Sequence, residues 1–423
     1  MVTSRLAPKK EPVVIDFGSA FIRCGFAGES RPIHVVPSPV AGNGHGDNRR
    51  NNSSSAWAGG SGSGSGLTRS KEEWVEVLTG VLSRLYTESL QCRPRERRVV
   101  LCESMVSPRP LREAIAHVLF LYLQVPSLHM CAGPAPALYC TGLDTGMVLD
   151  IGRSEAHVVA VYRGASLTSS YTDAPLGCLA VQERVGELLA EAEKEKEGEG
   201  EAEERRPLTS RELEDVVVRS CLVPVGGVPS ADQVSPMEFM FAGRRRVTSN
   251  ETVRTAAVEQ ALFQGDEEGR TLATLVLDCL KRCPLDCRTA LAQNVVVAGG
   301  GALLPGLCAR LAEEVEALAA AAAPGAGNPE GYAWARAVVL GDRYHHNHQG
   351  GGRGGGLCVV RVPVRRDQLL WTGASIMASL PRIADRSLTS EQYLAPMRRG
   401  GAGDGCRIGC RCHQWIGFFR QQQ

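Results

Sequence analysis

The chain has 423 residues, enough for two domains of ordinary size, each with a hydrophobic core of its own. Hydrophobic residues make up 43% of it, which is typical of a globular protein rather than a disordered one. The formal net charge of +1, from 47 basic and 46 acidic residues, argues against nucleic acid or a membrane surface as a partner bound through a global electrostatic field.

No apolar run approaches the roughly 20 residues that a membrane-spanning helix needs, so no membrane span is expected. The N-terminal residues contain no hydrophobic segment of the kind found in a secretory signal. Without such a signal, the 15 cysteines are interpreted as thiols in a reducing compartment, either cytosol or nucleus.

The first expected element is a hairpin over residues 13–29, where two apolar runs flank an Asp-Phe-Gly-Ser turn at residues 16–19. Such a tight turn presents backbone N–H groups and a small hydroxyl, which suit an anion. A second Asp-x-Gly turn ends the strand expected at residues 147–152, and three glycines follow the strand expected at residues 294–298. The ordered set of turns indicates two related halves that grip a nucleotide between them.

Other elements alternate between helix and strand. Apolar residues recur at mostly helical spacing over residues 71–86 and 112–123. Ser107 and Arg109 each precede a proline, which predicts a loop before the second helix. Short apolar strands are expected at residues 99–102 and within 148–161, so the pattern favours mixed α/β sheets with covered faces.

Three compositionally biased segments interrupt this pattern. Residues 41–70 are rich in Gly, Ser and Asn and predict a flexible linker. Residues 191–206 are highly charged and are expected to be solvated or marginally helical. Residues 319–356 pass from an alanine run into glycine-rich sequence. None of the three is expected to bury enough apolar surface to offset the entropy of ordering it.

Three loops carry a resemblance to a known family. Residues 14–29 resemble the first phosphate loop of the actin superfamily, residues 146–157 its second phosphate loop, and residues 294–306 its adenosine loop. Further actin-like segments lie at residues 259–264, 283–288, 371–380 and 390–393. The resemblance implies an α/β, duplicated actin/Hsp70/sugar-kinase fold with two large lobes around a nucleotide cleft.

The resemblance also implies how the chain is divided. The second subdomain of actins is expected to be reduced, because the 41–70 insertion occupies its place. The expected parts are a first lobe at 1–143 with that insertion, a second lobe at 144–365 with the biased segments 191–206 and 319–356, closing helices at 366–397 that return to the first lobe, and a divergent Cys-rich tail at 398–423.

The resemblance assigns nucleotide-binding roles by position. Asp16 and Asp150 would approach a metal–phosphate group through water, since Mg²⁺ keeps much of its hydration shell. Arg23 lies where actins place a lysine that reaches the β- and γ-phosphates. The remaining positions would surround phosphate or adenosine: Gly18, Ser19, Gly152, Gly177, Gly299, Gly300 and Gly301. The expected cofactor is ATP or ADP with Mg²⁺, bound but not turned over. The alternative is that these turns are retained only for folding.

The residues that actins use for hydrolysis are changed. The water-orienting glutamine of the family falls at Gly133, which has no side chain, and the second metal-associated aspartate falls at Arg153. His157 matches the histidine near the lytic water, but without its partners it is interpreted as structural. The positions resembling the base-contacting Lys-Glu pair are Val217 and Val218. We therefore expect a non-enzymatic actin-like body with no catalytic residues.

No metal site is expected among the cysteines and histidines. Cys279, Cys283 and Cys287 are spaced by four, but Pro284 interrupts them, and buried thiols are favoured. In the tail, Cys406, Cys410, Cys412 and His413 have the residue types of a zinc site but not the usual paired spacing. A translated intron or an alternative end is an equal explanation of the tail. The histidines at 345, 346 and 348 indicate only a surface loop.

Two segments resemble one member of the actin superfamily more than the others. Residues 97–104 and 118–127 are most similar to a divergent actin-related subunit of the pointed-end complex of dynactin. This implies a structural subunit that ends an actin-like filament at its pointed end and supports dynein-driven transport along microtubules. The implied partners are actin-like filament subunits and other pointed-end subunits, and the implied location is the cytoplasmic cytoskeleton.

Two alternatives remain at this point. One is a nuclear actin-related protein of a chromatin-remodelling complex, although the basic clusters at residues 49–50 and 244–246 are too short to be interpreted as a targeting signal. The other is an active actin-like ATPase, against which Gly133 and Arg153 both count.

Overall fold

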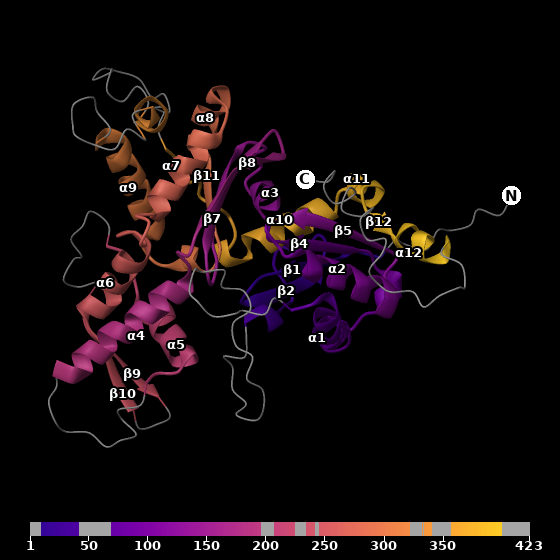
Figure 1. The fold of residues 1–423 in the computed structure, drawn as a ribbon, viewed down its shortest axis with the longest axis horizontal. Helices are drawn as coiled ribbons and strands as arrows, with labels where there is room; N and C mark the ends of the chain where they lie inside the picture. Colours follow the sequence, from indigo (N-terminus) through magenta and orange to yellow (C-terminus); the bar gives the residue numbers. More distant parts are fainter. Residues whose placement is uncertain are drawn as a thin grey trace. The chain divides into compact units, whose positions relative to one another are not determined.

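The computed structural model describes residues 10–41, 69–195, 207–224, 234–241, 245–321, 332, 334–340 and 357–399 (Figure 1). These residues belong to two compact units, and unit 1 consists of the described residues up to 142 together with those from 368 onward. Unit 2 consists of the described residues between 143 and 367.

Unit 1 is built on a six-stranded mixed sheet in the order β12-β5-β4-β1-β2-β3. Strands β1, β4 and β5 run parallel to one another, whereas β2, β3 and β12 pair antiparallel. Every residue of β1 and β4 is buried, as expected for strands covered on both faces. The bounds are β1 (Val13–Phe17), β2 (Phe21–Phe26), β3 (His34–Pro37), β4 (Val99–Glu103), β5 (Ser127–Ala132) and β12 (Leu388–Thr389).

Helices cover both faces of this sheet. Helices α1 (Lys71–Arg84) and α2 (Arg109–His117) pack together in one core cluster with β1 and β4, and α10 (Leu369–Ala378) lies in the other core cluster. Trp371 of α10 donates its indole N–H to the carbonyl of Val14 at 3.1 Å. Helix α3 (Pro134–Tyr139) approaches α10 so closely that a Cβ on Gly373 would overlap the carbonyl of Pro136. Short helices α11 (Pro381–Asp385) and α12 (Ser390–Arg399) complete the unit.

The two helices predicted in this unit differ in detail from the expectation. Helix α1 passes into a π-helical turn at Leu85–Ser89, and α2 into another at Val118–Tyr122. The loop expected at Arg109 is wrong, because Arg109 is the first residue of α2. Pro110, which follows it, lies in the first turn, where a missing backbone N–H costs no helical hydrogen bond.

Unit 2 contains a four-stranded sheet in the order β11-β6-β7-β8, in which β11 is parallel to β6 and the other pairs are antiparallel. Helices α7 and α8 contact this sheet, and a separate β9–β10 hairpin shares the core cluster of the unit. The strands are β6 (Gly146–Ile151), β7 (Ala156–Tyr162), β8 (Ala165–Ala174), β9 (Met237–Phe241), β10 (Arg245–Ser249) and β11 (Val295–Ala298). The helices are α4 (Cys178–Glu195), α5 (Ser210–Ser220), α6 (Glu251–Leu262), α7 (Leu272–Arg282), α8 (Leu285–Ala292) and α9 (Leu307–Ala321).

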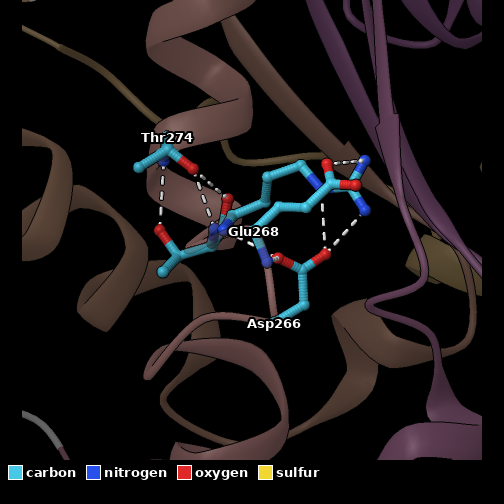
Figure 2. A network of polar contacts seen from close by, with 5 residues as sticks. Asp266, Glu268 and Thr274 are labelled. Carbon is cyan, nitrogen blue, oxygen red and sulfur yellow. Dashed lines mark hydrogen bonds and ion pairs between the residues drawn. The ribbon is translucent and has the colours of Figure 1, made fainter.

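A polar network fixes the start of α7 (Figure 2). The carboxylate of Asp266 accepts hydrogen bonds from the backbone N–H groups of Glu268 at 3.0 Å and Arg270 at 2.9 Å, and from the Arg270 side chain at 2.8 Å. Thr271 then caps the helix: its hydroxyl accepts from the N–H of Thr274 at 3.1 Å, and its own N–H donates to the Thr274 hydroxyl at 2.8 Å. The capping box therefore satisfies the N–H of Thr274, one of the groups that a helix start leaves unpaired.

Part of the segment expected not to pack does belong to a core. Ala319 ends up buried in α9, and Ala335, Val339 and Leu340 are buried in the core cluster of unit 2. The hydroxyl of Tyr332 donates to Asp278 of α7 at 3.0 Å. The expectation for residues 319–356 is thus wrong for these positions, because short apolar stretches within the biased sequence reach the core.

Several other expectations lie outside the described residues. They concern most of the 41–70 insertion, residues 196–206, the histidines near 345, and the Cys-rich tail. Residues 191–195 are the last residues of α4. Across the described ranges, no helix is both long and apolar enough to cross a bilayer.

Candidate nucleotide-binding site

The turn between β1 and β2 brings four of the predicted residues of unit 1 onto one hairpin. Asp16 and Arg23 are register partners, and a guanidinium nitrogen of Arg23 donates to the Asp16 carboxylate at 3.3 Å. Gly18 donates its N–H to the carbonyl of Phe21 at 3.1 Å, and a Cβ on Gly18 would lie 2.8 Å from that oxygen. The tightness of the turn therefore requires glycine. Ser19 is half-buried in the same turn.

This hairpin retains one unused buried donor. Nε of Arg23 is buried and has no hydrogen-bond partner among the described residues. A buried N–H without a partner costs free energy, so a phosphate oxygen at this position would satisfy it. The Arg23 guanidinium also offsets the negative charge of Asp16. Asp16 would therefore attract a divalent cation less strongly.

Gly133 lies where β5 ends and α3 begins. Its N–H donates to the carbonyl of Glu103 at 2.8 Å, and its backbone is right-handed helical with φ −48° and ψ −38°. A Cβ added here would meet the Glu103 carbonyl at 3.4 Å, an ordinary contact distance. The backbone therefore admits a residue with a side chain, and the glycine is not imposed by the fold.

Glu103, whose backbone carbonyl accepts from Gly133, has a buried side chain. Burial raises the pKa of the Glu103 carboxyl to about 7, although the Arg112 guanidinium, 2.9 Å away, opposes the shift. The sequence interpretation missed this group. The signal available was its place at the end of an apolar strand that runs parallel to β1, since the carboxyl ends of parallel strands meet at one edge of the sheet.

The turn between β6 and β7 carries the predicted phosphate residues of unit 2. Gly152 donates its N–H to the carbonyl of Glu155 at 2.9 Å. Asp150 and His157 are register partners, with 4.0 Å between a carboxylate oxygen and Nε2 of the imidazole. The His157 ring stacks on Tyr171 with 5.7 Å between centroids, and its Nδ1 is buried without a partner among the described residues. His157 is therefore packed against Tyr171, and its Nδ1 could still form a hydrogen bond.

Sequence reasoning also missed Glu155 in this turn. Burial raises the pKa of its carboxyl, and the charges of Asp173 and Asp150 add to that rise, whereas His157 opposes it. No spacing pattern distinguishes Glu155, because only the folded hairpin brings these acidic groups together.

The start of α4 is not a free anion site. The N–H of Cys178 donates to the carbonyl of Gly152 at 3.0 Å, and the N–H of Leu179 donates to the carbonyl of Arg153 at 2.8 Å. A Cβ on Gly177 would overlap the Arg153 carbonyl. Gly177 thus serves the close packing of the helix against the turn. Arg153 is half-buried, and its guanidinium forms no hydrogen bond or ion pair within the described ranges. This cation could therefore bind an anion.

The three glycines after β11 have different roles. Gly299 has a left-handed backbone with φ +91°, and a Cβ there would overlap the carboxylate of Asp150. A Cβ on Gly301 would overlap the side chain of Ile151. Gly300 is exposed, and the nearest atom to its hypothetical Cβ is the Cys178 sulfur at 4.0 Å. Folding alone therefore explains Gly299 and Gly301, but not Gly300.

The two valines proposed at the base-contacting positions do not form a pair. Val217 is buried in the core of unit 2 with 6% of its surface exposed, whereas Val218 is 73% exposed on α5. Cys279, Cys283 and Cys287 are buried free thiols. Among the residues that the structure describes, no group of three His, Cys, Asp or Glu side chains is arranged to hold a metal ion.

A family model described as Actin matches residues 7–216 and 230–395 of the chain. The chain belongs to the actin family. The predicted fold class is confirmed, since mixed α/β sheets with covering helices occur in both units of this actin-family chain.

Curated relatives align over most of their length. Actin-like protein 7A of Mus musculus is 21% identical over 395 residues, covering 87% of this chain and 77% of the relative. Actin-like protein 7A of Macaca fascicularis is 22% identical over 404 residues, covering 88% and 80%. Actin-related protein 10 of Dictyostelium discoideum is 21% identical over 430 residues, covering 91% and 86%.

Proposed function

We propose that this actin-family chain is a non-catalytic structural subunit of dynactin that ends the actin-like filament at its pointed end. The dynactin subunit that residues 97–104 and 118–127 resemble is actin-related protein 10, and a relative of that name aligns with 91% of the chain. The proposed location is the cytoplasmic cytoskeleton, where the subunit would support dynein-driven transport along microtubules.

The observation that carries the proposal is the insertion at residues 41–70. Actins place their projecting subdomain here, and its loop engages the next subunit on the pointed side. In this chain the position holds Gly, Ser and Asn sequence with almost no strand-forming residues. A head-to-tail assembly propagates only when both faces of each subunit are complementary, so loss of one face ends it.

The described residues on the two sides of the insertion lie close together. Strand β3 ends at Pro37. Arg69, two residues before the start of α1, donates to the carbonyl of Pro39 at 3.3 Å. The guanidinium of Arg69 also lies 4.8 Å from the ring centroid of Trp74 on α1. Ser70 then begins α1 with a reciprocal capping box to Glu73. The described residues on the two sides of the insertion thus contact each other within unit 1.

We further propose that ATP or ADP with Mg²⁺ binds without being hydrolysed. In unit 1, the β1–β2 turn would offer Arg23 Nε to a phosphate oxygen. In unit 2, the β6–β7 turn would offer the Arg153 guanidinium, and Gly300 is exposed for contact with a nucleotide. When bound, Mg²⁺ would supply charge neutralisation for the phosphates. Hydrolysis also needs an oriented water, and neither Gly133 nor Arg153 provides the groups that the family uses for this and for the metal.

The test is electron microscopy of dynactin purified with a tagged copy of this chain. The tag should appear once, at one terminus of the filament and at its pointed end, and the isolated chain should not polymerise. Labelling along the filament or at the barbed end would contradict the proposal. Co-purification with a chromatin remodeller from nuclei, and not with dynactin from cytosol, would favour the nuclear alternative instead.

A further inference from the structure

Cys102 and Cys131 are neighbours across two parallel strands of unit 1. Cys102 of β4 and Cys131 of β5 are register partners, and their sulfur atoms lie 3.4 Å apart. Neighbouring strands are about 4.8 Å apart, and disulfides bridge Cα atoms separated by about 4.4 to 6.8 Å. The backbone spacing therefore suits a disulfide, and the sulfurs need only close from 3.4 Å to the roughly 2.0 Å of an S–S bond.

We propose that this pair is a redox-modification site, at which hydrogen peroxide converts two thiols into a reversible intramolecular disulfide. The Cys131 thiol loses its proton and the thiolate attacks one peroxide oxygen. The O–O bond breaks, and the hydroxide that leaves takes up that proton, so a sulfenic acid and one water form. The Cys102 sulfur then attacks the Cys131 sulfur, and the hydroxyl leaves with the Cys102 proton as a second water. The two thiols lose two electrons and two protons in all, and the peroxide is reduced to two waters.

The surroundings assign different roles to the two sulfurs. Cys131 is half-buried, whereas Cys102 is fully buried, so an oxidant reaches Cys131 first. The hydrogen bond to Cys131 and burial raise the pKa of the Cys102 thiol, which keeps it protonated and slow to react with peroxide by itself. Cys131 is therefore the attacking thiol and Cys102 the resolving thiol.

The position of the pair gives the modification a consequence. Asp16 is the register partner of Cys102, so Asp16, Cys102 and Cys131 form one row across the carboxyl ends of β1, β4 and β5. The Cys131 thiol donates to the carbonyl of Leu101 at 3.3 Å. The disulfide removes that hydrogen bond and links β4 to β5 covalently beside Asp16. The proposed modification does not depend on the proposed role in a filament.

The experiment uses the full-length protein. The reduced protein is treated with hydrogen peroxide, free thiols are alkylated, and peptides prepared without reductant are analysed by mass spectrometry. We expect a linked peptide pair containing Cys102 and Cys131, lighter than the sum of the two peptides by two hydrogen atoms. Dithiothreitol should abolish it. The variant Cys131→Ala should not form the link, and Cys102→Ala should accumulate oxidised Cys131 instead.

A matched control comes from the same unit. Cys140 is also half-buried and donates to the carbonyl of Leu369 at 3.5 Å, so Cys140→Ala should form the link as the unaltered protein does. The proposal is overturned if Cys131 proceeds to sulfinic acid in the unaltered protein without linking. It is also overturned if Cys131 stays reduced at a peroxide concentration that oxidises the exposed Cys358. If Cys102→Ala does not fold, the unaltered protein and Cys131→Ala still decide between these outcomes.

Discussion

Asp16 and Arg23 face each other across the β1–β2 hairpin, with 3.3 Å between the carboxylate and the guanidinium. Only 9% of the Asp16 side chain and 14% of the Arg23 side chain are exposed. The register of the hairpin determines this contact, because a turn that begins at Gly18 places Asp16 and Arg23 opposite each other. The first phosphate turn thus carries a neutralised carboxylate rather than an isolated one.

Removing either charge of this pair should destabilise unit 1. We expect Asp16→Asn or Arg23→Met alone to lower the free energy of unfolding by about 1–3 kcal/mol, since each removes a contact that stabilises the other buried charge. The double variant should be less destabilised than the sum of the singles. Urea unfolding of all four proteins measures this coupling. Strict additivity would show that the contact contributes nothing.

The three glycines after β11 should separate folding from ligand binding. Gly299→Ala and Gly301→Ala should each lower the free energy of unfolding by about 1–3 kcal/mol, because their Cβ atoms have no room. Gly300→Ala should change it by less than about 0.5 kcal/mol. If Gly300 faces the nucleotide, Gly300→Ala should still weaken the binding of a fluorescent ATP analogue. Unchanged binding in this stable variant would show that Gly300 does not contact the nucleotide.

Glu103 should make the stability of unit 1 depend on pH. Its carboxyl has a pKa of about 7 in the folded protein against an ordinary 4.5, so the native state holds the proton more tightly than the unfolded state. The resulting stabilisation is fully present below about pH 4.5 and is lost as the pH rises through about 7, a difference of up to about 3 kcal/mol. Urea unfolding between pH 5 and 8 should show this fall in the unaltered protein and not in Glu103→Gln. Parallel pH profiles would contradict it.

ATP hydrolysis should be far slower than in polymerised actin. Single-turnover release of γ-phosphate from protein loaded with ATP measures it. Gly133→Gln should fold, since the backbone admits a side chain, and should not restore turnover, because Arg153 still places a cation where the family holds a metal-associated aspartate. The double variant Gly133→Gln/Arg153→Asp is the matched comparison. Recovery in the single variant would show that the metal position is misinterpreted.

The strands at the phosphate turns could be predicted from the sequence because apolar runs ending at Asp-x-Gly define both strand and turn. The resemblance to the actin superfamily rested largely on these turns. The π-helical turns after α1 and α2 could not be predicted, because helical periodicity continues through them. The π-helical turn at Arg336–Leu340 was missed because its apolar run is short and lies within biased sequence.

The site was predictable at the level of positions and not of contacts. The residues of each phosphate turn do lie on hairpins, as the pattern indicated. Their separate roles come from packing: Gly177 is required by the Arg153 carbonyl and Gly301 by Ile151, and both constraints join segments far apart in the chain. Whether nucleotide occupies these turns stays a prediction.

The bond from Trp371 to Val14 has a consequence for synthesis of the chain. Residues near both ends of the described sequence complete one unit, and Ser375 adds to this by donating to the carbonyl of Glu29 at 2.8 Å. All of unit 2 lies between them in the sequence. On the ribosome, β1 emerges long before α10, so the face of the sheet that α10 covers stays open while unit 2 is translated and folds. We therefore expect the core of unit 1 to be completed only after its last helices have been synthesised.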